Sequence, residues 1–124
     1  PRWAWTWLIR SPFDPTIAVS IDSVVDRKAE ALAGMESQFL ERGVSGSEAI
    51  MPKNEEEHRQ GLERVRNAFK RRFTRTADKY RELLKEIYGD TAGGAVEHAE
   101  AFELCEYGRR PSHEDLVRMF PIDR

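Results

Sequence analysis

The chain has 124 residues, of which 40% are hydrophobic and 34% are charged, and its formal net charge at pH 7 is −2. This length corresponds to one domain. No apolar run approaches the about 20 residues of a membrane-spanning helix, and the small net charge creates no overall field that would attract nucleic acid or anionic lipid. The single cysteine, Cys105, excludes an internal disulfide framework and favours a reducing, cytoplasmic location.

The N-terminal segment predicts two β-strands joined by a turn. Residues 3–9 alternate in a way that places three tryptophans on one face of a strand. Two prolines in residues 11–16 indicate a turn, because proline cannot pair regularly in a sheet, and the β-branched residues 17–21 form the second strand. An antiparallel pair of strands is marginal in water on its own. Residues 1–22 are therefore expected to join a sheet that other sequence supplies.

A first helix is predicted over residues 23–43. Asp22 or Ser23 can cap its N-terminus, and Gly43 provides a C-terminal stop. Apolar residues recur along it at intervals of three and four, which is the spacing of an amphipathic helix. Serine and glycine then indicate a loop before the next helix.

A long amphipathic helix is predicted over residues 53–89. Asn54 and Glu57 form a capping box at its start, and Gly89 ends it. One side of the helix carries an apolar stripe. The other side is basic and includes Arg59, Arg64, Arg66, Lys70, Arg71, Arg72 and Arg75.

The C-terminal segment, residues 90–124, gives a weaker pattern. The pair Gly93-Gly94 predicts a break in any helix, and residues 96–107 are compatible with a strand, a short helix or a mixture. A last short helix over residues 114–119 is capped by Ser112. The expected fold is mostly α with a short β pair, and α/β overall.

The histidines and the cysteine form no catalytic triad, metal set or carboxylate dyad by spacing alone. His58 and His113 are expected on helix surfaces, and Cys105 has acidic neighbours that would raise the pKa of its thiol. His98 lies between Glu97 and Glu100, which suits a ligand set or an acid–base pair, although the spacing matches no known metal motif. A structural role for His98 is favoured.

Two stretches of the sequence resemble the later part of the PIG-L/LmbE-like N-deacetylase family. The first comprises residues 13–22 (FDPTIAVSID), 28–32 (KAEAL) and 37–38 (SQ); the second is 99–102 (AEAF). In that family, a strand that ends in Asp-Ile or Ile-Asp is followed by a helix Lys-x-x-Ala-Leu, which ends near His-x-Ser-Gln, and Ala-Glu-Ala-Phe lies near the C-terminus. The resemblance covers residues 13–40 and 95–108 best.

The resemblance implies the C-terminal portion of a Rossmann-like α/β deacetylase, a zinc-dependent hydrolase that removes N-acetyl groups from amino sugars, such as N-acetylglucosamine derivatives, or from related amides. The family's His-Pro-Asp-Asp motif and later histidine pair, which supply the metal ligands and the general base, do not occur here. Met35 stands where relatives carry the histidine before x-Ser-Gln. Catalytic residues and a zinc ion are therefore not expected in this chain alone, and Pro1 is interpreted as a cut edge.

The resemblance also implies candidate positions for the wall of a substrate pocket, which are Ser37, Gln38, His98 and Glu100. The partner it implies is the N-terminal catalytic portion of the same protein or a partner chain, and a homo-oligomer is compatible with the sequence.

Two other functions remain open. A small helical interaction module could bind nucleic acid or an acidic protein through the basic helix face, although a face that is solvated, or paired with the acidic residues downstream, is favoured over nucleic acid. An enzyme that uses His98 and Glu100 on its own ranks last.

Overall fold

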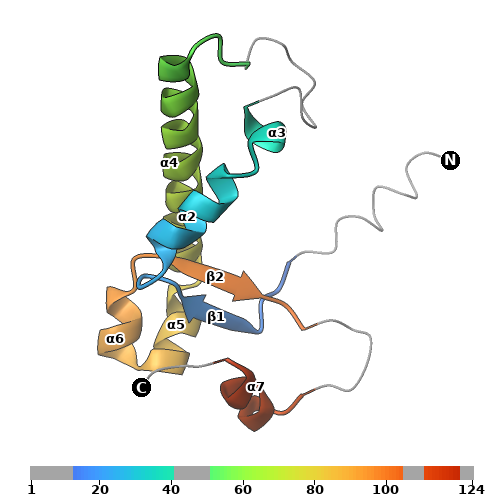
Figure 1. Ribbon diagram of the computed structural model, residues 1–124. Helices are drawn as coiled ribbons and strands as arrows, with labels where there is room; N and C mark the ends of the chain where they lie inside the picture. Colours follow the sequence, from blue (N-terminus) through green and yellow to red (C-terminus); the bar gives the residue numbers. More distant parts are fainter. Residues whose placement is uncertain (1–12, 41–50, 105–110, 121–124) are drawn as a thin grey trace, which may run out of the picture.

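The computed structural model describes residues 13–40, 51–104 and 111–120, and in this part of the chain the fold is mostly helical with one two-stranded antiparallel sheet (Figure 1). The elements in chain order are β1 (Ile17–Ser20), α2 (Val25–Ala33), α3 (Glu36–Phe39), α4 (Glu55–Lys79), α5 (Arg81–Tyr88), α6 (Asp90–Ala95), β2 (Ala99–Phe102) and α7 (His113–Met119). None of the described helices is long and apolar enough to cross a membrane.

The sheet joins two segments that are far apart in the sequence. Strand β1 pairs with β2 in antiparallel register, with Ile17 opposite Phe102 and Ser20 opposite Ala99. The strand predicted over residues 17–21 is confirmed, and the ambiguous segment 96–107 contains a strand. The other predicted strand, residues 3–9, lies outside the described residues.

The helix predicted over residues 23–43 is two helices in the described part, so the prediction of one continuous helix was wrong. Helix α2 ends at Gly34 and α3 begins at Glu36. Glycine is a poor residue in a helix interior, because it loses more backbone freedom than any other residue. The predicted cap was also wrong, because Val24 occupies the N-cap position without a side-chain hydrogen bond. The carboxylate of Asp22 is bonded to the segment before β2 instead.

The long helix predicted over residues 53–89 is likewise divided, into α4 and α5 at Tyr80. Its predicted ends are correct. The Asn54 side chain accepts a hydrogen bond from the Glu57 backbone at 2.9 Å, and Gly89 has a φ of 84°, which favours glycine. The change of direction at Tyr80 places α5 against β1, where the Tyr88 hydroxyl accepts a hydrogen bond from the backbone N–H of Ser20.

The pair Gly93-Gly94 does not break a helix as predicted, since both glycines lie within α6. The physical reason is packing against α5. A Cβ atom at Gly93 would lie 2.4 Å from the carbonyl oxygen of Leu84, so only glycine allows the two helices to approach this closely. The opposite is true of Gly94, where a Cβ atom would meet nothing within 4 Å.

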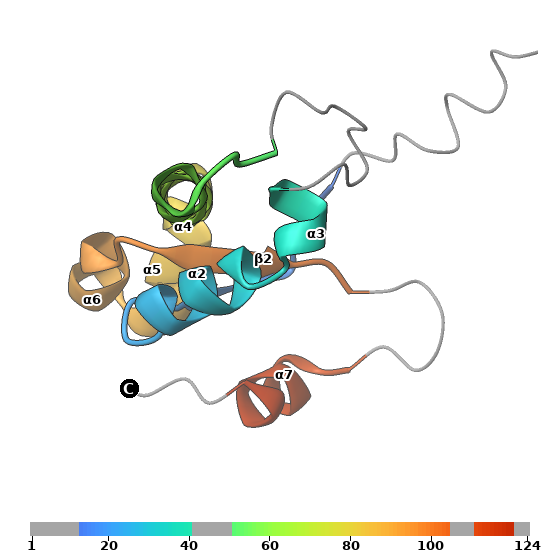
Figure 2. The same cartoon turned by 45° about the horizontal axis from the view of Figure 1, so that its top comes forward.

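The last helix, α7, is confirmed with the predicted cap at Ser112, which forms a capping box with Asp115. In both ribbon views α7 lies on the opposite side of the sheet from α4 (Figures 1 and 2). The rings of Phe102 on β2 and Phe120 after α7 are 5.5 Å apart.

The core has two parts that meet around the sheet. One is built largely from small residues, namely Ala18, Ala77, Leu84, Val96 and Ala99. The other contains Ile21, Val25 and Phe73, with Leu32 and Phe69 packed against it. Helix α4 contributes to both clusters, and α2 packs beside it (Figure 2).

Candidate functional site

The four residues predicted for a pocket wall fall into two groups. His98 immediately precedes β2 and Glu100 lies within it, two positions apart, so both project to the same side of the strand. Ser37 and Gln38 are exposed on α3. In the described part of the chain, neither Ser37 nor Gln38 is hydrogen-bonded to His98 or Glu100. Glu100 also lines a surface groove, described below, and neither Ser37 nor Gln38 belongs to its lining.

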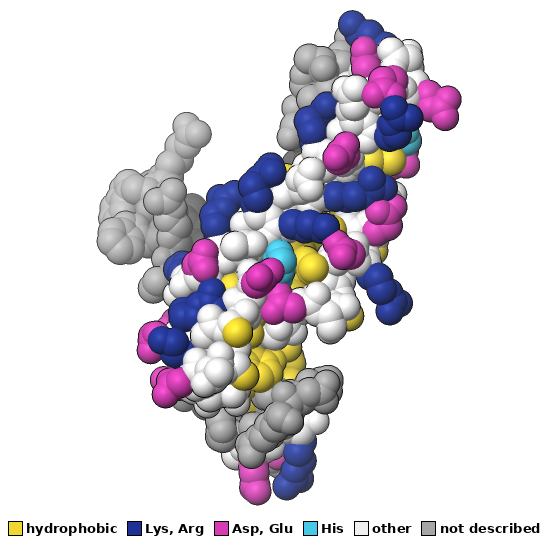
Figure 3. Space-filling model, turned by 90° about the vertical axis from the view of Figure 1, so that its left-hand side faces the viewer, with side chains coloured by type: hydrophobic (Ala, Val, Ile, Leu, Met, Phe, Trp, Pro, Cys, Tyr) yellow, Lys and Arg dark blue, Asp and Glu magenta, His cyan; other side chains and the backbone are white. Residues whose placement is uncertain are grey.

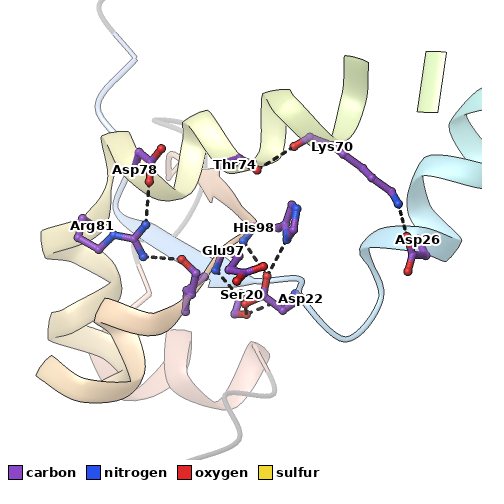
Figure 4. Close-up of polar contacts among 10 residues, drawn as sticks. Ser20, Asp22, Asp26, Lys70, Thr74, Asp78, Arg81, Glu97 and His98 are labelled. Carbon is purple, nitrogen blue, oxygen red and sulfur yellow. Dashed lines mark hydrogen bonds and ion pairs between the residues drawn. The ribbon is translucent and has the colours of Figure 1, made fainter. Parts of the chain in front are cut away.

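His98 is held by Asp22, the residue that follows β1 and Ile21 (Figure 4). The Oδ1 atom of Asp22 lies 2.9 Å from Nδ1 of the His98 ring and accepts a hydrogen bond of 2.7 Å from the His98 backbone. Its Oδ2 atom accepts from the Glu97 backbone at 3.1 Å and from the Ser20 hydroxyl at 3.3 Å. One carboxylate therefore fixes both the backbone and the ring at the entrance to β2.

Partial burial raises the pKa of Asp22, but the hydrogen bonds from the Glu97 backbone, the His98 ring and the His98 backbone outweigh it, so that the pKa lies below its ordinary value of 3.8. Asp22 is thus ionised at neutral pH. An ionised carboxylate can only accept hydrogen bonds. The Nδ1–H of His98 therefore donates to Asp22, and Nε2 is the ring nitrogen that remains for other chemistry.

This arrangement has the geometry of a base with an orienting carboxylate, in which the carboxylate selects the tautomer of the imidazole. Sequence reasoning assigned Asp22 to a helix cap and missed this role. The available signal was its position directly after one strand, which places it beside the end of an antiparallel neighbour. Asp22, Ser20 and Tyr88 also line a cavity of about 450 Å³.

Glu100 contributes to a different feature, a groove between α2, α4 and β2 with a volume of about 620 Å³. Its carboxylate forms an ion pair with Nζ of Lys28 on α2 at 2.8 Å, and both side chains are about one third exposed. The rings of Phe13, Phe69, Phe73 and Tyr80 supply the apolar lining. We call this feature the α2–α4 groove.

Three cations of α4 line the same groove: Arg72, Arg75 and Lys79. All three are exposed, and none of the described carboxylates lies within ion-pair distance of them. The Nε of Arg75 donates to the Arg71 carbonyl oxygen at 3.3 Å, and Nζ of Lys79 lies 5.0 Å from the centre of the Tyr80 ring. The groove thus combines aromatic surface with positive charge.

Other cations of α4 are neutralised within the fold, as the sequence favoured, but by α2 rather than by the acidic residues downstream. Arg66 donates to Glu30 at 2.7 Å, and Lys70 is paired with Asp26. The hydrogen bond from Lys70 lowers the pKa of Asp26, and that from Arg66 lowers the pKa of Glu30. Figure 3 shows basic and acidic side chains interspersed over this face of the molecule.

The described residues do not form the ligand set of a zinc enzyme. A catalytic zinc needs three protein ligands in addition to water or substrate, and no three His, Cys, Asp or Glu side chains converge anywhere in residues 13–40, 51–104 and 111–120. Asp22 and His98 bind each other, as do Glu36 and His58.

The sequence matches no family model, and no curated protein or solved structure is detectably similar to the chain. Functional inference therefore depends on the residues and the geometry described above.

Proposed function

We propose that the chain is the C-terminal part of a PIG-L/LmbE-like N-deacetylase, which removes N-acetyl groups from amino sugars or related amides. The observation that supports this most is the pairing of the two stretches that carry the resemblance. Residues 17–20 and 99–102 are antiparallel neighbours in one sheet, and Asp22 binds the His98 backbone across 76 positions of sequence. If both stretches come from one family's fold, they are expected to lie close together in space.

Under this proposal, the β1–β2 pair extends a Rossmann-like sheet and the helices of this chain cover it. Under the resemblance, the metal ligands and the general base belong to the family's His-Pro-Asp-Asp motif and later histidine pair, which would lie in the N-terminal portion. When bound there, zinc polarises the amide carbonyl and activates water. The contribution of this chain is positional: Asp22 fixes the His98 ring, and the Lys28–Glu100 ion pair fixes the side chain of Glu100.

The experiment is to determine the reading frame that contains the codon for Pro1 and to assay its complete product. We expect an upstream His-Pro-Asp-Asp motif, and zinc-dependent release of acetate from N-acetylglucosamine derivatives by the product. The 124-residue chain alone serves as the control and is expected to release none. A frame without the motif, or equal turnover by the chain alone, would contradict the proposal.

The competing function is an interaction module that binds nucleic acid or an acidic protein through the basic face of α4. Arg66 and Lys70, two of the cations on which duplex binding would depend, are already ion-paired with α2. Duplex RNA that binds with a steep salt dependence would favour this function. We expect no such binding, because these ion pairs leave fewer free cations along α4 for the phosphates of a duplex.

A further inference from the structure

We propose that the α2–α4 groove is a binding site for a nucleoside diphosphate or triphosphate, with the base against the aromatic lining and the phosphates against the cations of α4. The volume of about 620 Å³ lies in the range of about 300–1,000 Å³ that is usual for small-molecule sites. The inference does not depend on the deacetylase assignment, since Arg72, Arg75 and Lys79 have no role in it.

The cations set the charge and the length of the ligand. Arg72, Arg75 and Lys79 are spaced by three and four residues, so they lie on one face of α4 and span about 10 Å along its axis. A single phosphate cannot reach all three, whereas a chain of two or three phosphates can. Arginine also binds phosphate oxygens through paired N–H groups, which makes it well suited to this role.

A comparison with neighbouring cations shows that the groove cations are available. Arg66 and Lys70 on the same helix, and Lys28 across the groove, each have a carboxylate partner. Arg72 and Arg75 have none among the described residues. Because a fold gains little from holding like charges together without a counter-charge, an anionic ligand is the natural complement of this cluster.

The aromatic lining of the groove indicates that the ligand also carries a flat base beside its phosphates. Phe69 is half-buried and packs on the buried ring of Phe73, with centroids 6.3 Å apart and an interplanar angle of 29°, so Phe69 rather than Phe73 can meet a ligand. Phe13 meets Tyr80 edge to face at 6.1 Å and is still 50% exposed. Stacking on an aromatic side chain is a favourable contact that every base can make. A ligand with phosphates alone would leave this surface unused, and a nucleoside would leave the cations unused.

Lys28 and Glu100 explain why the site favours one nucleotide over a nucleic-acid strand. Their ion pair neutralises the α2 side of the groove, so the unpartnered charge of the groove is confined to its α4 side. A duplex would also keep its bases stacked and out of reach of Phe13 and Tyr80.

The test is isothermal titration calorimetry of the full chain with ADP, ATP, pyrophosphate and adenosine, each without metal. We expect ADP and ATP to bind, and pyrophosphate and adenosine each to bind at least about tenfold more weakly. The double variant Arg72→Gln/Arg75→Gln should weaken ADP binding about tenfold or more. Arg71→Gln, on the same helix but outside the groove lining, is the matched control and should leave the affinity unchanged.

Several outcomes would overturn the proposal. These are no heat of binding with millimolar ADP, equal affinity for ADP and pyrophosphate, or equal losses in the Arg71 control and the double variant. A 12-residue oligouridylate that binds more than tenfold tighter than ADP would assign the groove to a nucleic-acid strand instead. Since Arg72 and Arg75 are exposed, both variants should fold, and circular dichroism checks this before titration.

Discussion

The two ends of helix α4 are held by different kinds of contact. At its C-terminal end, Ala77 is buried with Ala18 and Ala99 of the sheet, and Phe73 is buried with Ile21 and Val25. At its N-terminal end, the helix is fixed by the Asn54 cap, by the half-buried hydrogen bond between His58 and Glu36, and by the packing of Leu40 on Gly61. The sheet end therefore depends on close packing, whereas the far end combines one close apolar contact with polar contacts that water weakens.

This difference predicts unequal sensitivity to substitution. Interiors are packed as densely as organic crystals, so a change of one methyl group there is felt. Exposed ion pairs each contribute little, because solvent screens them and two long side chains must be ordered. Variants of the close-packed and buried contacts around the sheet should thus have larger effects than variants of the cap and the ion pairs of α4.

The largest effect is expected for Gly93→Ala. The new Cβ atom would lie 2.4 Å from the Leu84 carbonyl oxygen, and backbone atoms cannot move aside as a flexible side chain can. Overpacking typically costs about 1–3 kcal/mol, and this variant should be at the upper end of that range. Urea denaturation followed by circular dichroism measures the loss of unfolding free energy.

Gly94→Ala is the matched control, since it makes the same change one residue later in α6. A Cβ atom there meets nothing within 4 Å, and alanine is a better helix residue than glycine by roughly 0.5–1 kcal/mol. The control should therefore be slightly more stable than the natural chain. If both variants lose the same stability, the close approach of α5 and α6 does not exist.

The next effect is expected for Asp22→Ala, which removes the acceptor for the Glu97 backbone, the His98 backbone and the His98 ring. The loss of such partners costs roughly 1–3 kcal/mol at pH 7. Asp14→Ala, at an exposed position without a recorded side-chain contact, is the control and should be near neutral.

The pH dependence of the Asp22 variant has a defined sign. The pKa of Asp22 is lower in the folded chain than its ordinary value of 3.8. A group with a depressed folded pKa stabilises the fold above its unfolded pKa, and the stabilisation is lost as the pH falls through the folded value. The difference in stability between the natural chain and Asp22→Ala should be full above pH 3.8 and should shrink below it. A constant difference on acidification contradicts the ionised state of Asp22.

The predicted and observed roles of Asp22 show how much of this fold the sequence could predict. Local signals were reliable where the cause is local: the Asn54 cap, the stop at Gly89 and the Ser112 cap are all correct. The cap assigned to Asp22 was wrong, because a partner 76 positions away competes for its carboxylate. The spacing of residues within one segment gives no information about a hydrogen-bond partner that lies so far away in the sequence.

The same dependence on residues far away in the sequence explains why the role of Gly93 and the division of the basic face of α4 were not predicted. Gly93 looked like a helix breaker, but its lack of a side chain is what allows α6 to pack on α5. The basic face of α4 was visible in the sequence. Its division into cations paired with α2 and cations left in the groove depends on how two helices pack, which periodicity does not determine.

A smaller effect is expected for Asn54→Ala at the far end of α4. The variant removes the side-chain acceptor for the Glu57 backbone, which lies 2.9 Å away. Loss of an N-cap costs about 0.5–2 kcal/mol. Asn67→Ala, at an exposed position within the same helix, should not destabilise the chain. Equal losses from both asparagines would show that α4 is not capped at Asn54.

The smallest effect is expected for Arg66→Gln, which breaks the ion pair with Glu30. Glu30 is exposed and Arg66 lies near the surface, so the thermal midpoint should fall by less than for Asn54→Ala. The difference should disappear in about 1 M NaCl, where the screening length is about 3 Å. Arg71→Gln, which removes a cation without a recorded carboxylate partner, should show no salt-dependent change. If Arg66→Gln instead destabilised the chain as much as Gly93→Ala, a partly exposed ion pair would stabilise the fold as strongly as the close contact between α5 and α6, and the expected order of effects would be wrong.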